Sequence, residues 1–137
     1  MTAPAHALPL VNLYVPGNPV PKARPRLARG HVYTPPRTVH AEERLLEYLK
    51  IKYPRLRPVY GSLGVTLRFW IAATKKGERS LRQPDLDNLI KLVWDSFNGV
   101  VWHDDSQVDK VEATAFRWSP EPHTDIVVYQ LTMEPVA

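Results

Sequence analysis

The apolar residues of this sequence follow two different periods in neighbouring segments. Between Leu63 and Ile71 they occupy every second position, which is the pattern of a strand with one buried face. Between Leu86 and Phe97 they recur at spacings of three and four, which is the pattern of a helix with one buried face. A strand and a helix this close together in the chain predict a domain in which helices pack against a sheet.

The remaining segments extend this prediction to the whole chain. A second helix is expected between Thr38, which can act as its N-cap, and Pro54, which stops it. Further strands are expected at residues 10–15, 100–102, 108–118 and 125–133. The sequence therefore predicts one α+β domain over residues 1–137, with a mixed sheet of about five strands and two main helices packed on it. We expect residues 1–9 to form a flexible tail.

The composition excludes several classes of protein. The chain contains no cysteine, so it has neither a disulfide framework, nor a thiolate metal site, nor a thiol nucleophile. It has no apolar run near the ~18–20 residues that a membrane-spanning helix needs, and its N-terminus lacks a secretory signal pattern. We therefore expect no membrane association and a cytoplasmic location.

Two basic segments suggest an acidic partner, with nucleic acid as the first choice. The chain has a net charge of +4 and a pI of about 9.5. Residues 16–37 form a basic, proline-rich loop with five cations, no acid and six prolines, so they cannot be a regular helix or a central strand. Residues 75–82 contain four cations and one glutamate. Such loops are often only solvated, but they can also follow a phosphate backbone. We expect DNA contacts at Lys22, Arg24, Arg26, Arg29, Lys75, Lys76, Arg79 and Arg82.

The acidic residues are concentrated in one part of the chain. Residues 84–109 contain six aspartates against one lysine, which gives a local net charge of −5. Asp85 and Asp87 lie where a loop becomes the second predicted helix, and Asp104 and Asp105 lie in the turn after a short apolar run. Carboxylates gathered in this way repel one another unless a cation lies among them. A hard divalent cation such as Mg²⁺, which prefers oxygen ligands, is the simplest candidate.

These residues suggest a site for chemistry at a phosphate. We hypothesise that the 104–105 turn folds back beside the start of the helix, so that Asp85, Asp87 and either Asp104 or Asp105 hold Mg²⁺. The ion would stabilise charge on a scissile phosphate and activate a water. Lys91 lies one helical turn after Asp87 and could direct a second positive charge at the same phosphate.

Each of these residues also has an ordinary structural explanation. Asp85 could be an N-cap, and the helix dipole favours Asp87 in the first turn. Asp87 and Lys91 could form a surface pair at the i, i+4 spacing. Residues 104–106 could be a plain turn. His103, beside the acidic pair, could shuttle a proton or be simply solvated.

The motifs around these residues resemble a known family. The acidic region contains Asp-Leu-Asp-Asn at 85–88, then Lys91 and Asp95, then Asn-Gly-Val-Val at 98–101 and Asp-Asp-Ser-Gln-Val at 104–108. The basic region contains Gly-Asn-Pro-Val-Pro-Lys-Ala-Arg-Pro-Arg at 17–26 and Val-Tyr-Thr-Pro at 32–35. Together these motifs resemble the RusA family of Holliday-junction resolvases.

The resemblance implies a homodimeric, Mg²⁺-dependent endonuclease that resolves four-way DNA junctions by paired, symmetric incision in recombination and repair. The family's metal-binding carboxylates match Asp85, Asp87 and Asp105, and its functional lysine matches Lys91. We expect that Mn²⁺ can substitute for Mg²⁺. A C2 dimer suits the substrate, because it carries two sites with the two-fold symmetry that cutting both strands requires.

The resemblance also marks one departure and leaves two alternatives. Family members contact DNA through the opening basic loop, which here means the region of Lys22, Arg24 and Arg26. Many relatives carry a lysine near the end of the strand that follows the Asp-Asp turn, where this chain has Arg117. The protein could instead be a DNA-binding module that has lost catalysis, or a Mg²⁺-dependent nuclease without junction preference. The intact set of aspartates argues against the first alternative.

Overall fold

The computed structural model describes residues 8–72 and 84–131. This part of the chain forms two α-helices, a short 3₁₀ helix and six strands. In chain order the elements are β1 (Pro9–Pro16), β2 (Arg26–Ala28), β3 (His31–Tyr33), α1 (Pro36–Lys52), β4 (Leu63–Ala72), α2 (Leu86–Phe97), η1 (Asp105–Gln107), β5 (Val108–Ser119) and β6 (His123–Gln130). The prediction of an α+β fold with two main helices is confirmed.

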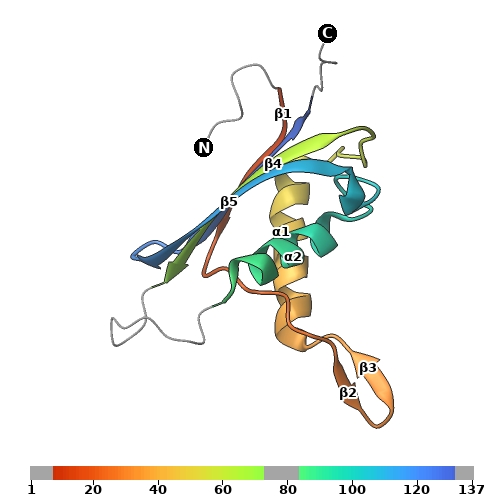
Figure 1. Cartoon of the computed structure of the whole chain (residues 1–137), viewed down its shortest axis with the longest axis vertical. Coiled ribbons are helices and arrows are strands. Elements are labelled where there is room, and N and C mark those ends of the chain that lie inside the picture. The colour runs from red at the N-terminus through yellow and green to blue at the C-terminus, as the bar shows by residue number, and fades with distance from the viewer. Residues whose placement is uncertain (1–7, 73–83, 132–137) are drawn as a thin grey trace.

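Four of the strands form a mixed sheet in the order β1-β6-β4-β5 (Figure 1). β6 pairs antiparallel with both β1 and β4, whereas β4 and β5 are parallel. Two parallel neighbours need a connection that carries the chain back to the same end of the sheet. α2 lies in this connection and therefore runs in the direction opposite to β4 and β5.

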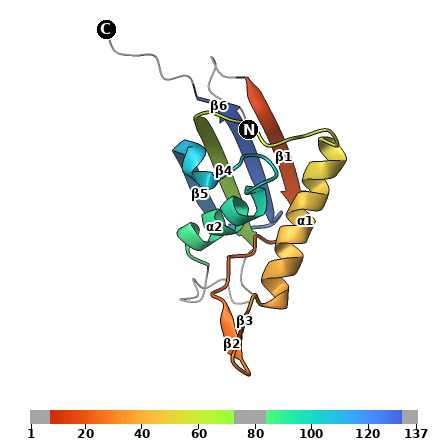
Figure 2. The ribbon, with the colours of Figure 1, turned by 90° about the vertical axis from the view of Figure 1, so that its right-hand side faces the viewer.

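Both helices cover the same face of the sheet (Figure 2). The alternation between Leu63 and Ile71 places every second side chain of β4 on that face, where all five apolar residues are buried. They pack against apolar residues of both helices, including Leu45 and Leu49 of α1 and Leu89, Leu92, Val93 and Phe97 of α2. None of the helices in the described part of the chain is long and apolar enough to cross a membrane.

The opposite face carries a row of stacked rings, one from each strand. Trp70 of β4 stacks on Phe116 of β5 with ring centroids 4.0 Å apart, and on His123 of β6 at 5.4 Å. His123 in turn stacks on Tyr14 of β1 at 4.7 Å. Offset stacking of this kind stabilises neighbouring strands beyond simple burial. The row therefore ties the four strands together on the face that the helices leave uncovered.

The sheet has four strands where about five were expected. Residues 100–102 do not form a strand, because the chain turns there: the N–H groups of Val100 and Val101 both bond to the carbonyl of Phe97, and Trp102 makes only isolated bridges. The Trp102 side chain is fully buried and its Nε1 donates to Asn98 Oδ1 at 2.7 Å. The apolar run that suggested a strand is thus a buried turn.

The start of α1 also differs from the sequence prediction. Pro35 occupies the N-cap position and Pro36 begins the helix, where proline is well tolerated because its missing N–H would have no partner. Thr38 lies within the first turn and is buried, and its Oγ1 accepts a hydrogen bond from the N–H of Ala23 at 3.2 Å. Its hydroxyl therefore anchors the proline-rich segment to the helix, and the N-cap assignment was wrong.

A small hairpin projects from the body of the protein (Figure 1). It consists of β2 and β3, which pair antiparallel as a separate two-stranded sheet within the basic, proline-rich segment. Arg29 and Gly30 both adopt positive φ at its tip, which is the backbone that a tight two-residue hairpin turn needs. Every residue of both strands is exposed. We call residues 26–33 the basic arm.

Candidate nucleic-acid interface and carboxylate site

Asp85 and Asp87 lie at the exposed start of α2. Asp85 occupies the N-cap position, but its side chain makes no capping hydrogen bond. The Asp87 carboxylate accepts a hydrogen bond of 3.0 Å from the N–H of Asn88. Because the N-terminal end of a helix carries a partial positive charge, two ionised carboxylates are tolerated there. Both side chains are exposed and can reach a ligand.

Lys91 lies one turn further along α2 and is exposed. It makes no hydrogen bond or ion pair with another residue of the described chain. The surface pair between Asp87 and Lys91, which the spacing allowed, is therefore not formed. The ammonium group is free to contact an anion near the start of the helix.

The turn after α2 uses its two aspartates differently. Asp104 is the N-cap of η1: its carboxylate accepts from the N–H of Ser106 at 3.2 Å, while Gln107 Oε1 accepts from the N–H of Asp104 at 3.1 Å. The hydrogen bonds from Ser106 lower the pKa of the Asp104 carboxyl group. The Asp104 carboxylate is thus used in the hydrogen bond that caps η1, which makes Asp105 the better candidate for a metal ligand.

Asp105 is held at the far end of α2. Its Oδ2 accepts a hydrogen bond of 3.1 Å from Asn98 Nδ2, and the Asn98 Oδ1 accepts from Trp102 Nε1. Asn98 is the C-cap of the helix, so this amide joins the end of α2, the buried turn and the start of η1. The sequence had suggested only that Asn98 and Gly99 end the helix, and nothing in it indicated that Asn98 positions Asp105.

The three aspartates therefore lie at opposite ends of α2, the helix whose course Figure 1 shows. A helix of 12 residues is about 18 Å long, and Asp85 and Asp105 lie beyond its two ends. Within residues 8–72 and 84–131, no group of three or more His, Asp or Glu side chains is close enough to hold a metal ion. The donors suit Mg²⁺ chemically, but a single copy of the chain does not gather them.

The reason lies in the topology of the sheet. Because β4 and β5 are parallel, α2 must begin near the end of β4 and finish near the start of β5. Asp85 and Asp87 precede or begin this crossover, whereas Asp105 follows it. The expectation that the 104–105 turn folds back beside the start of the helix is thus wrong within one chain.

Lys22 is an internal link, although we expected it to contact DNA. Its Nζ lies 3.3 Å from Glu42 Oε1 of α1 and 3.2 Å from Asp95 Oδ2 of α2, and its backbone N–H donates to the carbonyl of Asn88 at 2.9 Å. Burial would lower the pKa of Lys22, but the carboxylates of Asp95 and Glu42 outweigh that effect and raise it. Lys22 therefore connects the proline-rich segment to both helices.

The other expected DNA contacts fall into two groups. Arg24, Arg26 and Arg29 are exposed on and next to the basic arm, as a phosphate contact requires. Leu27 and Val32, which pair across the arm, are also exposed. The remaining four cations, Lys75, Lys76, Arg79 and Arg82, lie outside the described residues.

Arg117 lies near the end of β5, as the resemblance placed it. Its Nη2 donates to the carbonyl of Pro84 at 3.0 Å. This contact holds the end of β5 against the residue that precedes Asp85. Arg117 is thus a positioning residue for the start of α2.

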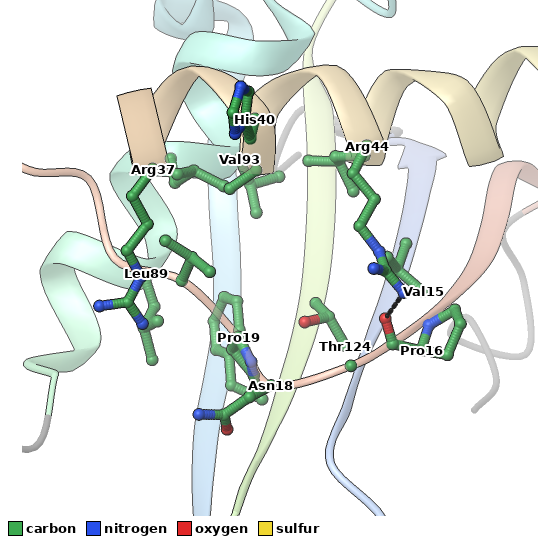
Figure 3. Close-up of a pocket in the computed structure, with 16 residues that line it drawn as sticks. Val15, Pro16, Asn18, Pro19, Arg37, His40, Arg44, Leu89, Val93 and Thr124 are labelled. Atoms are coloured by element: carbon green, nitrogen blue, oxygen red, sulfur yellow. Dashed lines mark hydrogen bonds between the residues drawn. The ribbon is translucent and has the colours of Figure 1, made fainter. Parts of the chain in front are cut away.

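A cavity of about 490 Å³ opens between α1, the segment after β1 and α2 (Figure 3). Apolar side chains of β1, β4 and both helices form most of its wall. Arg37 and Arg44 extend from α1 on either side of the opening towards the segment at 16–19, and Arg44 Nη2 donates to the carbonyl of Pro16 at 2.9 Å. No local sequence pattern indicated this cavity, because its parts come from distant segments.

The fold defines a small α+β domain that presents an exposed basic arm and carboxylates at the start of a helix. Comparison with known proteins identifies the family. Residues 16–129 match the family described as endodeoxyribonuclease RusA, and the chain belongs to that family. It is also similar to the uncharacterized protein YqaN of Bacillus subtilis (strain 168), with 25% identity over 141 residues that cover 89% of this chain and 97% of YqaN.

Proposed function

We propose that this protein is a divalent-metal-dependent endodeoxyribonuclease that resolves four-way DNA junctions in recombination and repair. The observation that carries this proposal is the family match, which spans the basic arm, Lys91 and every aspartate considered above. The exposed cations of the arm support DNA as the partner, because phosphate contacts dominate the affinity of proteins for nucleic acids. Mg²⁺ is the proposed cofactor, with Mn²⁺ as a substitute.

The proposed catalytic residues are Asp85, Asp87, Asp105 and Lys91. A divalent ion bound by the three carboxylates would supply charge stabilisation at the scissile phosphate. The Lys91 ammonium, which has no partner among the described residues, is proposed to contact a phosphate oxygen where negative charge grows during attack by water. Arg24, Arg26 and Arg29 are proposed to hold the DNA backbone beside this centre.

The separation of the carboxylates favours a homodimer with shared sites. If two copies place their α2 helices side by side and antiparallel about a two-fold axis, the start of each helix meets the end of the other. Asp85 and Asp87 of one copy would then lie near Asp105 of the second copy. Ile90 and Trp94, four residues apart on α2, are only partly buried and could contribute apolar contacts between the helices.

This arrangement also suits the substrate. Two shared sites would be separated by roughly the length of α2, about 18 Å for its 12 residues. They would be related by the same two-fold symmetry as the two strands that must be cut. A monomer with all its carboxylates at one end of the helix would have no such pair of sites.

Cleavage of a labelled four-way junction beside a linear duplex of the same sequence tests the function. We expect metal-dependent, paired incision of the junction and little cutting of the duplex. Asp87→Asn should abolish incision while leaving junction binding intact, because it removes one metal-binding charge from an exposed side chain. Equal cutting of both substrates would favour a nuclease without junction preference. Binding without any incision, in Mg²⁺ or Mn²⁺, would favour a module that has lost catalysis.

A further inference from the structure

The cavity between the two helices has the chemistry of a binding site for an apolar group that carries a negative charge. None of the sixteen described residues that line it carries a carboxylate, whereas Arg37, His40 and Arg44 contribute cations or a titratable ring. Arg37 makes no hydrogen bond or ion pair with the described residues, so its guanidinium is available to an anion. The volume of the cavity, about 490 Å³, lies within the range of ~300–1,000 Å³ typical of small-molecule sites.

The interior of the cavity is apolar, with a few polar groups. Phe69, Leu89 and Val93 form part of its wall but are almost fully buried, and the partly buried Val20 and Ala41 add accessible apolar surface. Such an apolar lining suits a flat ring. Asn18 Oδ1 already accepts from the N–H of Ala72, which leaves the amide N–H₂ group of Asn18 as a donor at the opening. The Thr124 hydroxyl, which also lines the cavity, can donate or accept. These two groups could bind the polar edge of a heterocyclic base.

The cavity adjoins the start of α2. Leu89 lies one helical turn from Asp85, and its N–H bonds to the carbonyl of Asp85 at 3.2 Å. The segment that forms the rim is tied to the same turn, because the N–H of Lys22 bonds to Asn88. A group held in the cavity would therefore sit near Asp85 and Asp87, two of the carboxylates to which we assigned incision.

We infer that this cavity binds one unstacked nucleotide, with its base between the apolar walls and its phosphate at Arg37 and Arg44. The inference rests on the proposed function for the source of the nucleotide, which is the branch point of the DNA substrate. Extruding a base costs least where its stacking or pairing is already weakened, and a branch point interrupts the continuous stack of a regular duplex. A free nucleoside monophosphate has the same chemistry and is the second possible source.

Fluorescence of 2-aminopurine, which rises when the base leaves the stack, tests the inference. We would place it at the branch point of a four-way junction and add protein in EDTA, so that no strand is cut. Emission should rise by about threefold or more with the wild-type protein. Ala41→Leu, which fills the cavity from α1 without removing a polar group, should abolish most of this rise. Arg37→Gln changes an exposed residue at the opening, cannot unfold the core, and should weaken the rise.

Arg57→Gln is the matched control, because it removes an exposed cation beyond the far end of α1 and should leave the rise unchanged. The same proteins would be titrated with free 2-aminopurine deoxyriboside 5′-monophosphate. In one outcome, Ala41→Leu and Arg37→Gln abolish binding of the free nucleotide but leave the junction signal at its wild-type level. That result would support a nucleotide site in the cavity whose ligand is a free nucleotide. If both variants behave like the wild type in both titrations, the inference is wrong. Incision by the wild-type protein in Mg²⁺ tests the proposed function separately.

Discussion

The side-chain amide of Asn98 donates a hydrogen bond of 3.1 Å to the carboxylate of Asp105, across the turn that follows α2. This contact holds Asp105 about one helix length away from Asp85 and Asp87. The family motif nevertheless assigns all three residues to one metal site. The observed separation and this proposed assignment are compatible if each site takes carboxylates from two copies of the chain.

Mixed dimers of Asp87→Asn and Asp105→Asn test this shared site. Each variant alone should be inactive. In a mixed dimer, one site combines both changes, while the other combines the intact Asp85 and Asp87 of one copy with the intact Asp105 of the other. We therefore expect incision of one strand at up to about half the wild-type rate, and no paired incision. If each copy built its own site, the mixture would show no incision at all.

A structural measurement complements this experiment. The chain has no cysteine, so introduced thiols have no competitor. Asn88→Cys in one copy and Ser106→Cys in the other should form a disulfide between copies under mild oxidation, since a disulfide needs Cα atoms within about 7 Å. Placing one cysteine at Lys50, on α1, serves as the control and should give no cross-linked dimer with Ser106→Cys.

Lys91 should contribute to catalysis and little to folding. It is exposed, and its removal leaves no cavity in the core. Loss of one charged group at a preorganised site typically costs ~10²–10³ in rate, which is our expectation for Lys91→Ala in single-turnover cleavage at saturating enzyme. Lys91→Arg should restore little activity, because a planar guanidinium does not replace a compact ammonium. Lys50→Ala is the matched control, and a Lys91→Ala rate within about threefold of wild type would exclude the catalytic role.

The basic arm should account for part of the salt dependence of DNA binding. Arg24→Ala and Arg26→Ala should each flatten the slope of log affinity against log salt by about one unit, because each lost phosphate contact releases one counterion fewer. Arg57→Ala removes the same charge beyond the far end of α1 and should leave the slope unchanged. Junction binding measured by anisotropy at several salt concentrations would show the difference. Unchanged slopes in both Arg24→Ala and Arg26→Ala would show that the DNA-binding surface lies elsewhere.

Local patterns were sufficient for the main elements of the fold. The alternation in β4 and the helical spacing in α2 each depend on neighbours within one segment, and both were predicted correctly. The strand predicted at 100–102 was wrong, because a buried turn and a short buried strand have the same apolar composition. The hairpin inside the proline-rich segment was not anticipated, since its turn depends on positive φ at Arg29 and Gly30.

The arrangement of the candidate site depended on contacts that no local pattern contains. Asp105 is far from Asp85 because β4 and β5 are parallel, and the pairing direction of two strands is not visible in either one. Lys22 looked like a DNA contact because its neighbours in the sequence are cations. Its two carboxylate partners come from α1 and α2, which only the folded structure brings together.

Lys22 provides the last test, because its two interpretations predict opposite results. As a link between the helices, Lys22→Met should leave two partly buried carboxylates without their cation. Breaking an exposed ion pair costs little stability, whereas breaking a buried one costs several kcal/mol. Because these carboxylates are partly buried, we expect a decrease of about 1–3 kcal/mol in the free energy of unfolding. The additional change Asp95→Asn should recover part of it, since it removes one of the stranded charges.

The pH dependence of stability should show the same link. The pKa of Lys22 is raised in the folded protein above its ordinary value of 10.5. The ion pairs therefore contribute their full stability below that value, and the contribution disappears as the pH rises through the folded pKa. The free energies of unfolding of the wild type and of Lys22→Met, measured with denaturant, should converge as the pH rises above about 10.5.

In DNA binding, Lys22→Met should keep the wild-type salt slope, unlike Arg24→Ala. A flattened salt slope with an unchanged free energy of unfolding would instead show that Lys22 contacts DNA.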